Sequence, residues 1–442
     1  MSEAAAKLGR IRWRPTVAAA LALAAAILAC SFYGKLRANI HHSENYNIAR
    51  ALVSGRGFAD AIGEPTGPTA WCAPVYPLLE ATLLWIGDGS DSFLIGVLVC
   101  FHLTVLIGTV VLVLVLANQT TQHVGVGLTA AVFALGLLYH FWWWFTLAQD
   151  CWLMMLSLDV IIAGACWLRP LASRPRAVAW GLCGGLCALT NPGVGFAWGV
   201  LSLGLGARAG AWRRTGLAVL CAALVLTPWT IRNYLLFGRL IPVKSNLAYE
   251  LYQSQCLQAD GLYESRTSPL HPTSPGSRER REYQQLGEDA YLRRKGEQFR
   301  DAVAADPVDF ADRLASRFLG TTLWYVPFNR AQAATQPWAL WARRLTFPLP
   351  FVALLFLVCS GLREPLQRPQ WVVIGLYLCY LLPYVAASYY ERYAVPLLAV
   401  KVLLVVWALD RLLSLVRSPG LARAQACSAA AGTEEVPLHQ QP

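Results

Sequence analysis

Long apolar stretches alternate with short polar links along most of this chain. The clearest stretch runs from Ser92 to Ala117 and contains no Asp, Glu, Lys or Arg. It exceeds the roughly 20 residues that a helix needs to cross the hydrocarbon core of a bilayer. Together with nine similar stretches, it predicts an all-α polytopic membrane protein with about ten transmembrane helices. The other nine are Thr16–Tyr33, Val124–Phe141, Asp150–Leu168, Ala177–Thr190, Val194–Gly206, Gly216–Ile231, Leu345–Leu362, Trp371–Ala387 and Ala394–Leu413.

The apolar run from 177 to 206 is interrupted by Asn191 and Pro192. Proline breaks or kinks a helix, so the run is either a tight hairpin of two short spans or one kinked helix. A single helix would invert every later span and place Arg208 and Arg213 on the outer side. Because Lys and Arg collect in cytoplasmic links, the charge pattern favours the hairpin.

The formal net charge of +11 arises from 37 Lys and Arg against 26 Asp and Glu. The Arg residues lie mostly in short links between apolar stretches, which membrane topology explains better than nucleic-acid binding. A basic leader with Lys7 and Arg10 precedes the first stretch. Placing this leader in the cytoplasm predicts an inner (plasma) membrane protein with both termini cytoplasmic. The links that share this side contain Arg169, Arg174, Arg176, Arg208, Arg213, Arg214, Arg363 and Arg368.

This topology divides the chain into four parts. Residues 1–231 form an N-terminal transmembrane module that includes a first outer loop, 34–74, with amphipathic helices. Residues 232–341 form a larger, mostly helical extracytoplasmic loop, with an amphipathic helix expected after Pro307. Residues 342–413 hold the C-terminal spans, and residues 414–442 form a disordered cytoplasmic tail. Chemistry is expected in the two outer loops.

Two carboxylates are predicted to lie on the outer face. Glu44 follows the first span at the start of an amphipathic helix, where partial desolvation would raise its pKa toward a value useful for a general base. The alternative is a first-turn Glu favoured by the helix dipole. Asp150 opens the fourth span and is a candidate for holding a divalent cation or orienting an acceptor, or simply caps that helix.

Three further charged residues lie within or beside the predicted spans. Arg232 and Arg392 are placed where a span meets the outer surface, so their guanidinium groups are candidates for clamping a lipid-linked phosphate. The alternative for both is snorkelling to ordinary lipid headgroups. Asp159 lies inside a span, where an unpaired charge is costly, and it is expected to meet a structural partner on a neighbouring helix.

Three stretches of the chain together resemble one family of membrane enzymes. They are Ser43–Phe58, which ends in Gly-Arg-Gly-Phe; Ala73–Ala81, which begins Ala-Pro-Val-Tyr; and Thr227–Gly238, which contains Pro-Trp-Thr-Ile-Arg-Asn-Tyr. Their order is similar to that of the C-type (GT-C) glycosyltransferase superfamily, specifically the bacterial relatives of the dolichyl-phosphate-mannose protein mannosyltransferases and the aminoarabinose lipid A transferases. The family typically has an acidic pair in the first loop. Here Glu44 is the second acidic position, and Ser43 stands where an Asp is common.

The resemblance implies transfer of a sugar from a polyprenyl-phosphate donor to a hydroxyl group of a cell-envelope acceptor. That acceptor would be a glycan, a lipid or a protein on the outer face of the membrane. Glu44 would be the base of an inverting displacement, and Arg232 and Arg392 would bind the donor phosphate. Asp150 would orient the acceptor or hold a metal. No cofactor is required, although a divalent cation remains compatible with this role.

Two other functions stay open at this point. A lipid or amphiphile transporter or flippase would explain many spans and rim arginines without catalysis. Against it, the chain shows no internal repeat, and its polar residues collect at the outer face instead of the membrane midplane. A catalytically inactive relative of the enzymes is the second alternative, because Ser43 breaks the acidic pair.

Overall fold

The computed structural model describes residues 27, 29–63, 65–140 and 150–431. Within them the regular elements are helices, accompanied by two isolated β-bridges. Six helices are long and apolar enough to cross a membrane, which confirms an all-α membrane protein. These six are Asp91–Thr120, Cys151–Leu168, Trp212–Phe237, Pro337–Gly361, Arg368–Ala386 and Glu391–Val416, and each contains or overlaps a predicted span.

The other four predicted spans are not among these six helices. Most of Thr16–Tyr33 lies outside the described residues, and residues 29–39 are helical. The span predicted from Val124 begins as α6 (Val126–His140), whose apolar portion is short. The remaining two correspond to α8 (Arg174–Thr190) and α9 (Pro192–Ala209).

Helices α8 and α9 form the predicted hairpin. Asn191 separates them in an extended conformation, with φ −161° and ψ 131°, and its side chain accepts a hydrogen bond from the N–H of Gly193 at 2.8 Å. An asparagine N-cap of this kind starts a new helix. A Cβ at Gly184 would collide with the ring of Trp198, so glycine allows the two helices to approach closely. The alternative of one kinked helix is thereby excluded.

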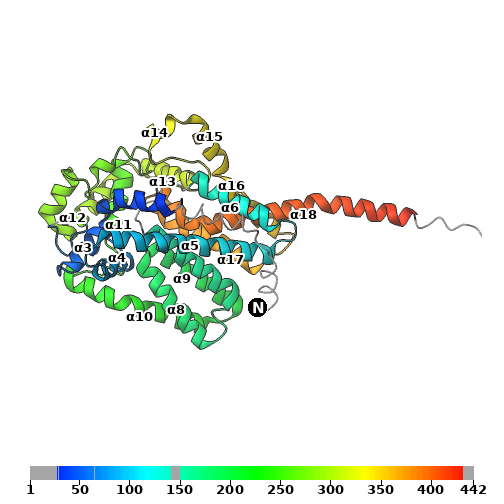
Figure 1. The fold of residues 1–442 in the computed structure, drawn as a ribbon, viewed down its shortest axis with the longest axis horizontal. Coiled ribbons are helices and arrows are strands. Elements are labelled where there is room, and N and C mark those ends of the chain that lie inside the picture. Colours follow the sequence, from blue (N-terminus) through cyan, green and yellow to red (C-terminus); the bar gives the residue numbers. More distant parts are fainter. Residues whose placement is uncertain (1–26, 28, 64, 141–149, 432–442) are drawn as a thin grey trace, which may run out of the picture.

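Helices from the two predicted outer loops cover one end of the bundle (Figure 1). Two of them belong to the predicted first outer loop, namely α3 (Glu44–Val53) and α4 (Val75–Ile86). The large loop contributes α11 (Leu247–Tyr252), α12 (Arg278–Ala305) and α13 (Pro307–Thr322). Buried Arg317 of α13 donates to the carbonyl oxygens of Val385 and Ala386 at 2.7 and 3.3 Å, which anchors the loop to the end of α17 (Arg368–Ala386).

The remaining long helices run between this covered end and the opposite end. Helix α5 (Asp91–Thr120) starts beside α3, where the hydroxyl of Tyr46 donates to Asp91 at 2.6 Å. At the opposite end, the carboxylate of Asp410 accepts hydrogen bonds from the backbone N–H groups of residues 122–124. Asp410 belongs to α18 (Leu398–Ala431), which packs against α5, α6, α16 (Leu349–Gly361) and α17 in the core.

Helix α18 continues beyond the predicted end of the last span at Leu413. Residues 414–431 extend it as one helix, where the sequence predicts the start of a disordered tail. Several alanines in this segment favour helix, because alanine has the highest intrinsic helix propensity. Figure 1 shows this segment projecting from the end of the bundle opposite to α3 and α12.

Candidate functional site

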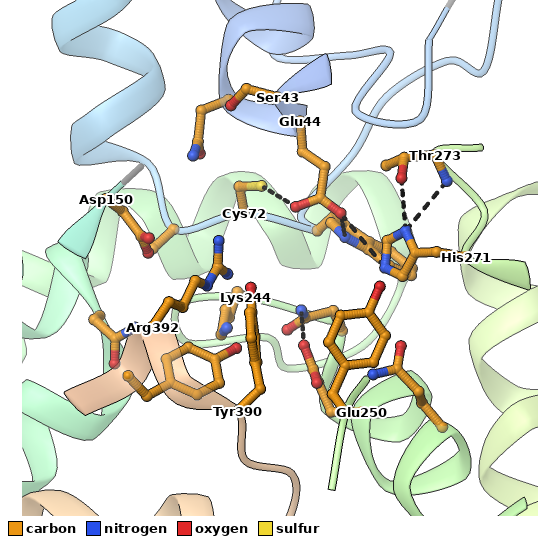
Figure 2. A pocket seen from close by; sticks show the side chains of 18 of the residues that line it. Ser43, Glu44, Cys72, Asp150, Lys244, Glu250, His271, Thr273, Tyr390 and Arg392 are labelled. Carbon is orange, nitrogen blue, oxygen red and sulfur yellow. Dashed lines mark hydrogen bonds and ion pairs between the residues drawn. The ribbon is translucent and has the colours of Figure 1, made fainter. Parts of the chain in front are cut away.

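A polar cavity of about 320 Å³ lies at the covered end of the bundle. Segments far apart in the sequence line it: the start of α3, the loop before α4, Asp150, the hairpin tip at Asn191, the large loop, and the start of the last span. Figure 2 shows the Glu44 carboxylate between Cys72 and His271, with Asp150 and Arg392 across the hollow. The structure therefore brings together three of the four predicted site residues: Glu44, Asp150 and Arg392.

Both carboxylate oxygens of Glu44 accept a hydrogen bond. The indole N–H of Trp71 donates to Oε1 at 2.9 Å, and the thiol of Cys72 donates weakly to Oε2 at 3.9 Å. Only a quarter of the Glu44 side chain is exposed. This desolvation raises the pKa of Glu44 above its ordinary value, and the opposing charge of Arg392 limits the rise. The outcome is a carboxylate with more basic character than a surface glutamate, held firmly at Oε1 and weakly at Oε2.

His271 faces the more firmly held oxygen. Its Nε2 lies 3.9 Å from Oε1 of Glu44. Its Nδ1 lies 2.7 Å from the hydroxyl of Thr273 and accepts the backbone N–H of Thr273 at 3.3 Å. Because Nδ1 accepts, the neutral ring carries its proton on Nε2, toward Glu44. Burial lowers the pKa of His271 to about 4, so this ring is neutral near pH 7.

Two cationic side chains line the cavity, Arg392 and Lys244. The guanidinium of Arg392 lies over the rings of Tyr390 and Tyr393, 4.9 and 5.2 Å from their centroids. The thiol of Cys151 donates to the carbonyl oxygen of Arg392 at 3.7 Å, which joins the start of α7 (Cys151–Ala163) to the start of the last span. Arg392 and Asp150 are thereby fixed on one wall, and the cations give that wall affinity for an anion.

The rest of the lining contains uncharged polar groups, one further carboxylate and aromatic rings. Asn246 donates to Oε1 of Glu250 at 3.3 Å, and both line the cavity. Gln253 follows at the first residue of a π-helical turn, a local irregularity that often occurs at functional sites. Tyr263 also lines the cavity. Such acceptor groups beside aromatic rings suit a polyhydroxylated ligand.

Arg232 does not line this cavity. Its guanidinium donates to the carbonyl oxygens of Thr69 and Phe58 at 2.7 and 2.8 Å and to the side chain of Asn233 at 2.9 Å. It also lies over the ring of Trp229, 4.8 Å from the centroid. These contacts fix the first outer loop against the end of α10 (Trp212–Phe237), so the structure places Arg232 in a supporting position.

Asp159 has the structural partner that the sequence predicts. The hydroxyl of Thr109 in α5 donates to its Oδ2 at 2.6 Å, deep inside the bundle. In the first loop, Asp60 accepts the backbone N–H groups of Thr66 and Gly67 at 2.8 and 2.9 Å and adopts a positive φ of 62°. Asp60 thus shapes a tight turn, in the way that Asp side chains often do.

The described residues contain no cluster of protein ligands for a metal ion. Within residues 27–431, apart from the undescribed gaps, no three His, Cys, Asp or Glu side chains lie close enough together to hold one. A magnesium ion is commonly bound by one or two carboxylates together with substrate phosphates. Both roles predicted for Asp150, orienting an acceptor and holding a metal, therefore stay predictions.

The sequence pattern does not predict several of the cavity residues. Trp71, Asn191, Lys244, Glu250 and His271 sit in loops or at helix ends, with no spacing that marks them. Asn191 carried the one available signal, because it interrupts an apolar run at the predicted outer side. The tip of that hairpin meets the cavity, and the hydroxyl of Tyr384 donates to Oδ1 of Asn191 at 3.3 Å.

No protein-family model, curated protein or solved structure matches this chain.

Proposed function

We propose that this chain is a membrane glycosyltransferase that uses a polyprenyl-phosphate sugar as donor and a hydroxyl group of a cell-envelope acceptor. The observation that carries the proposal is the placement of Glu44 and Arg392 in one cavity at the end of a membrane bundle. A proton acceptor and an anion-binding group are what such a transfer requires on opposite sides of the reacting carbon. The resemblance of the first outer loop to the GT-C superfamily supports the same activity.

In the proposed reaction, the acceptor hydroxyl oxygen forms a bond to the anomeric carbon of the sugar. The bond between that carbon and the phosphate oxygen breaks, and its electron pair leaves with the lipid phosphate. Glu44 takes the hydroxyl proton at Oε2, because Oε1 accepts the stronger bond from Trp71 while Oε2 accepts only the weak thiol bond from Cys72. Arg392 and Lys244 stabilise the negative charge that develops on the phosphate. A single displacement of this kind inverts the anomeric centre.

The remaining cavity residues have roles that follow from their positions. Asp150 lies on the wall of Arg392 and orients either the acceptor or the guanidinium. Ser43 is buried and lines the cavity directly beside Glu44, in the position where the resembling family has an acidic residue. One carboxylate suffices as a base, so the proposed mechanism does not need a second one there.

The proposal is tested by sugar transfer in proteoliposomes, using a panel of polyprenyl-phosphate sugars and envelope acceptors. Glu44→Gln keeps the shape of the side chain and removes the base, so transfer should fall by roughly 10²- to 10⁴-fold. Glu297→Gln is the matched control, because Glu297 is an exposed residue of α12 outside the cavity. Its transfer rate should equal that of the wild type.

Three results would change the proposal. Equal losses in both variants would show that the assay reports folding and not chemistry. If sugar transfer survives Glu44→Gln, the chain is still a glycosyltransferase, but the base is another residue, Asp150 or Glu250. A wild-type chain that binds the lipid donors, transfers no sugar and moves them between leaflets would establish the transporter instead.

A further inference from the structure

A second cavity, of about 330 Å³, lies at the end of the bundle opposite to the proposed active site. It is formed where the last turn of α9 meets the first turn of α17, two helices that pack against each other. Its lining residues are Leu205, Arg208, Ala209, Leu366, Arg368 and Trp371. The basic links at this end predict that it faces the cytoplasm, and the proposed transfer reaction does not use it.

Two guanidinium groups give this cavity a positive charge. The side chain of Arg208 lies over the indole of Trp371, 4.8 Å from the ring centroid. Arg368 has a buried Nε without a hydrogen-bond partner. Among the residues that the structure describes, neither guanidinium is paired with a carboxylate. Arg368 is also the first residue of α17, where the positive end of the helix dipole adds to the attraction for an anion.

The other four lining residues are apolar, and open space continues from them toward the membrane interior. Gly204 lies one turn before Arg208 on the same face of α9, and Gly375 lies one turn after Trp371 on α17. A Cβ added at either glycine would meet no atom within 4 Å. The missing side chains therefore leave open space on both helices directly beyond the cavity. A small soluble anion would make no contact with this space, whereas an acyl chain would fill it.

We propose that this cavity binds an anionic phospholipid, with its headgroup phosphate between Arg208 and Arg368 and one acyl chain along Gly204 and Gly375. The guanidinium groups recognise the phosphate by charge-assisted hydrogen bonds. Trp371 lies at the same level, as tryptophan does at membrane–water interfaces. The occupant is thus a lipid of the leaflet at this end of the bundle, and it remains bound whether or not sugar transfer occurs.

The first test is native mass spectrometry of the full chain with phosphatidylglycerol and with phosphatidylcholine. Phosphatidylglycerol should stay bound to the wild type, and its affinity should fall on the order of tenfold in the Arg208→Gln, Arg368→Gln double variant. The matched control is Arg213→Gln with Arg363→Gln, which removes the same charge from exposed positions of the neighbouring links. An equal loss of affinity in both double variants would show that the lipid responds to the overall positive charge of this end and not to a specific site. That result would overturn the proposal.

A second pair of variants tests the acyl-chain groove without changing charge. Gly204→Leu fills the open space and should weaken phosphatidylglycerol retention several-fold, while Gly199→Leu should not. Gly199 also faces open space, but it lies five residues away, roughly 1.4 turns, on a different face of α9. Equal retention by the two variants would remove the acyl chain from the proposal. Displacement of the lipid by millimolar inorganic phosphate would show a site for free anions only.

Discussion

The indole nitrogen of Trp71 lies 2.9 Å from Oε1 of Glu44 and donates a hydrogen bond to it, across 27 positions of the chain. Trp71 itself is buried among Tyr249, Tyr283 and Tyr291 of the large outer loop. The orientation of Glu44 therefore depends on the packing of both outer loops against each other. A hydrogen bond to the ionised carboxylate also lowers the pKa of Glu44 and opposes the rise that burial causes.

Replacing Trp71 by Phe should shift the pH dependence of sugar transfer. The ring remains and the donor is lost, so the pKa of Glu44 rises further above its ordinary value of 4.5. Because the base must be ionised, the acid limb of kcat/KM should move to higher pH, by about one unit if the bond contributes about 1.5 kcal/mol. The other charges near Glu44 are Arg392, Lys244 and Asp150, and the variant leaves them in place. An unchanged acid limb would assign the base to another group.

His271 should make the folded protein sensitive to acid. Its pKa is about 4 in the folded chain against an ordinary 6.5, so between these values the unfolded chain holds a proton that the folded chain does not. Stability from this group is present above pH 6.5 and is lost as the pH falls toward 4. His271→Gln should therefore lose less Tm than its parent between pH 6.5 and 4. Both chains should carry Glu44→Gln, because Glu44 titrates with the opposite sign nearby.

Arg232 and Arg392 should give opposite results when each is changed to Gln. Arg232→Gln removes the hydrogen bonds to Thr69 and Phe58, and should lower the free energy of unfolding by about 2 kcal/mol. Arg392→Gln should chiefly raise the KM for the lipid-phosphate donor. Thermal unfolding and steady-state kinetics separate the two effects. A stable Arg232→Gln variant with a raised KM for the donor would show that Arg232 binds the donor phosphate after all.

Thr109 should be needed to keep Asp159 inside the bundle. Thr109→Val preserves the shape and deletes the hydroxyl that donates to Asp159 at 2.6 Å. The variant leaves a carboxyl group buried without its partner, at a cost of about 1 to 3 kcal/mol. Thr104→Val in the same helix is the control, because Thr104 is exposed and bonds only to its own helix backbone. Equal Tm values for the two variants would show that Asp159 finds another partner.

The sequence predicted those parts of the molecule that depend on local chemistry. Uninterrupted apolar runs such as Ser92–Ala117 marked spans, and the Asn191–Pro192 break marked the hairpin. The alternation of sides placed Glu44, Asp150 and Arg392 at one end, and the structure puts them in one cavity. This prediction needed only the number of spans between the residues. An even number of spans brings the chain back to the same side of the membrane, and helices of similar length end at the same surface.

The rest depended on contacts between distant segments, which periodicity does not encode. Arg232 and Arg392 have similar positions at the ends of spans. The guanidinium of Arg232 donates to two backbone carbonyls, whereas Arg392 lines the cavity. His271 lies in a Pro and Ser rich loop that predicts no regular structure. Its position beside Glu44 follows from the fold of the whole outer loop.

The distribution of the cavity residues along the chain has a consequence for biosynthesis. Glu44 leaves the ribosome early, Asp150 and Lys244 follow, and Arg392 is made only with the last span. A nascent chain that has inserted all but this span already contains Lys244 but lacks Arg392, so only one of the two cationic side chains of the cavity is present. Under the proposed function, a fragment that stops before Arg392 would lack part of the donor-phosphate site however well it inserts. The lining of the cavity is complete only when the final helix enters the bundle.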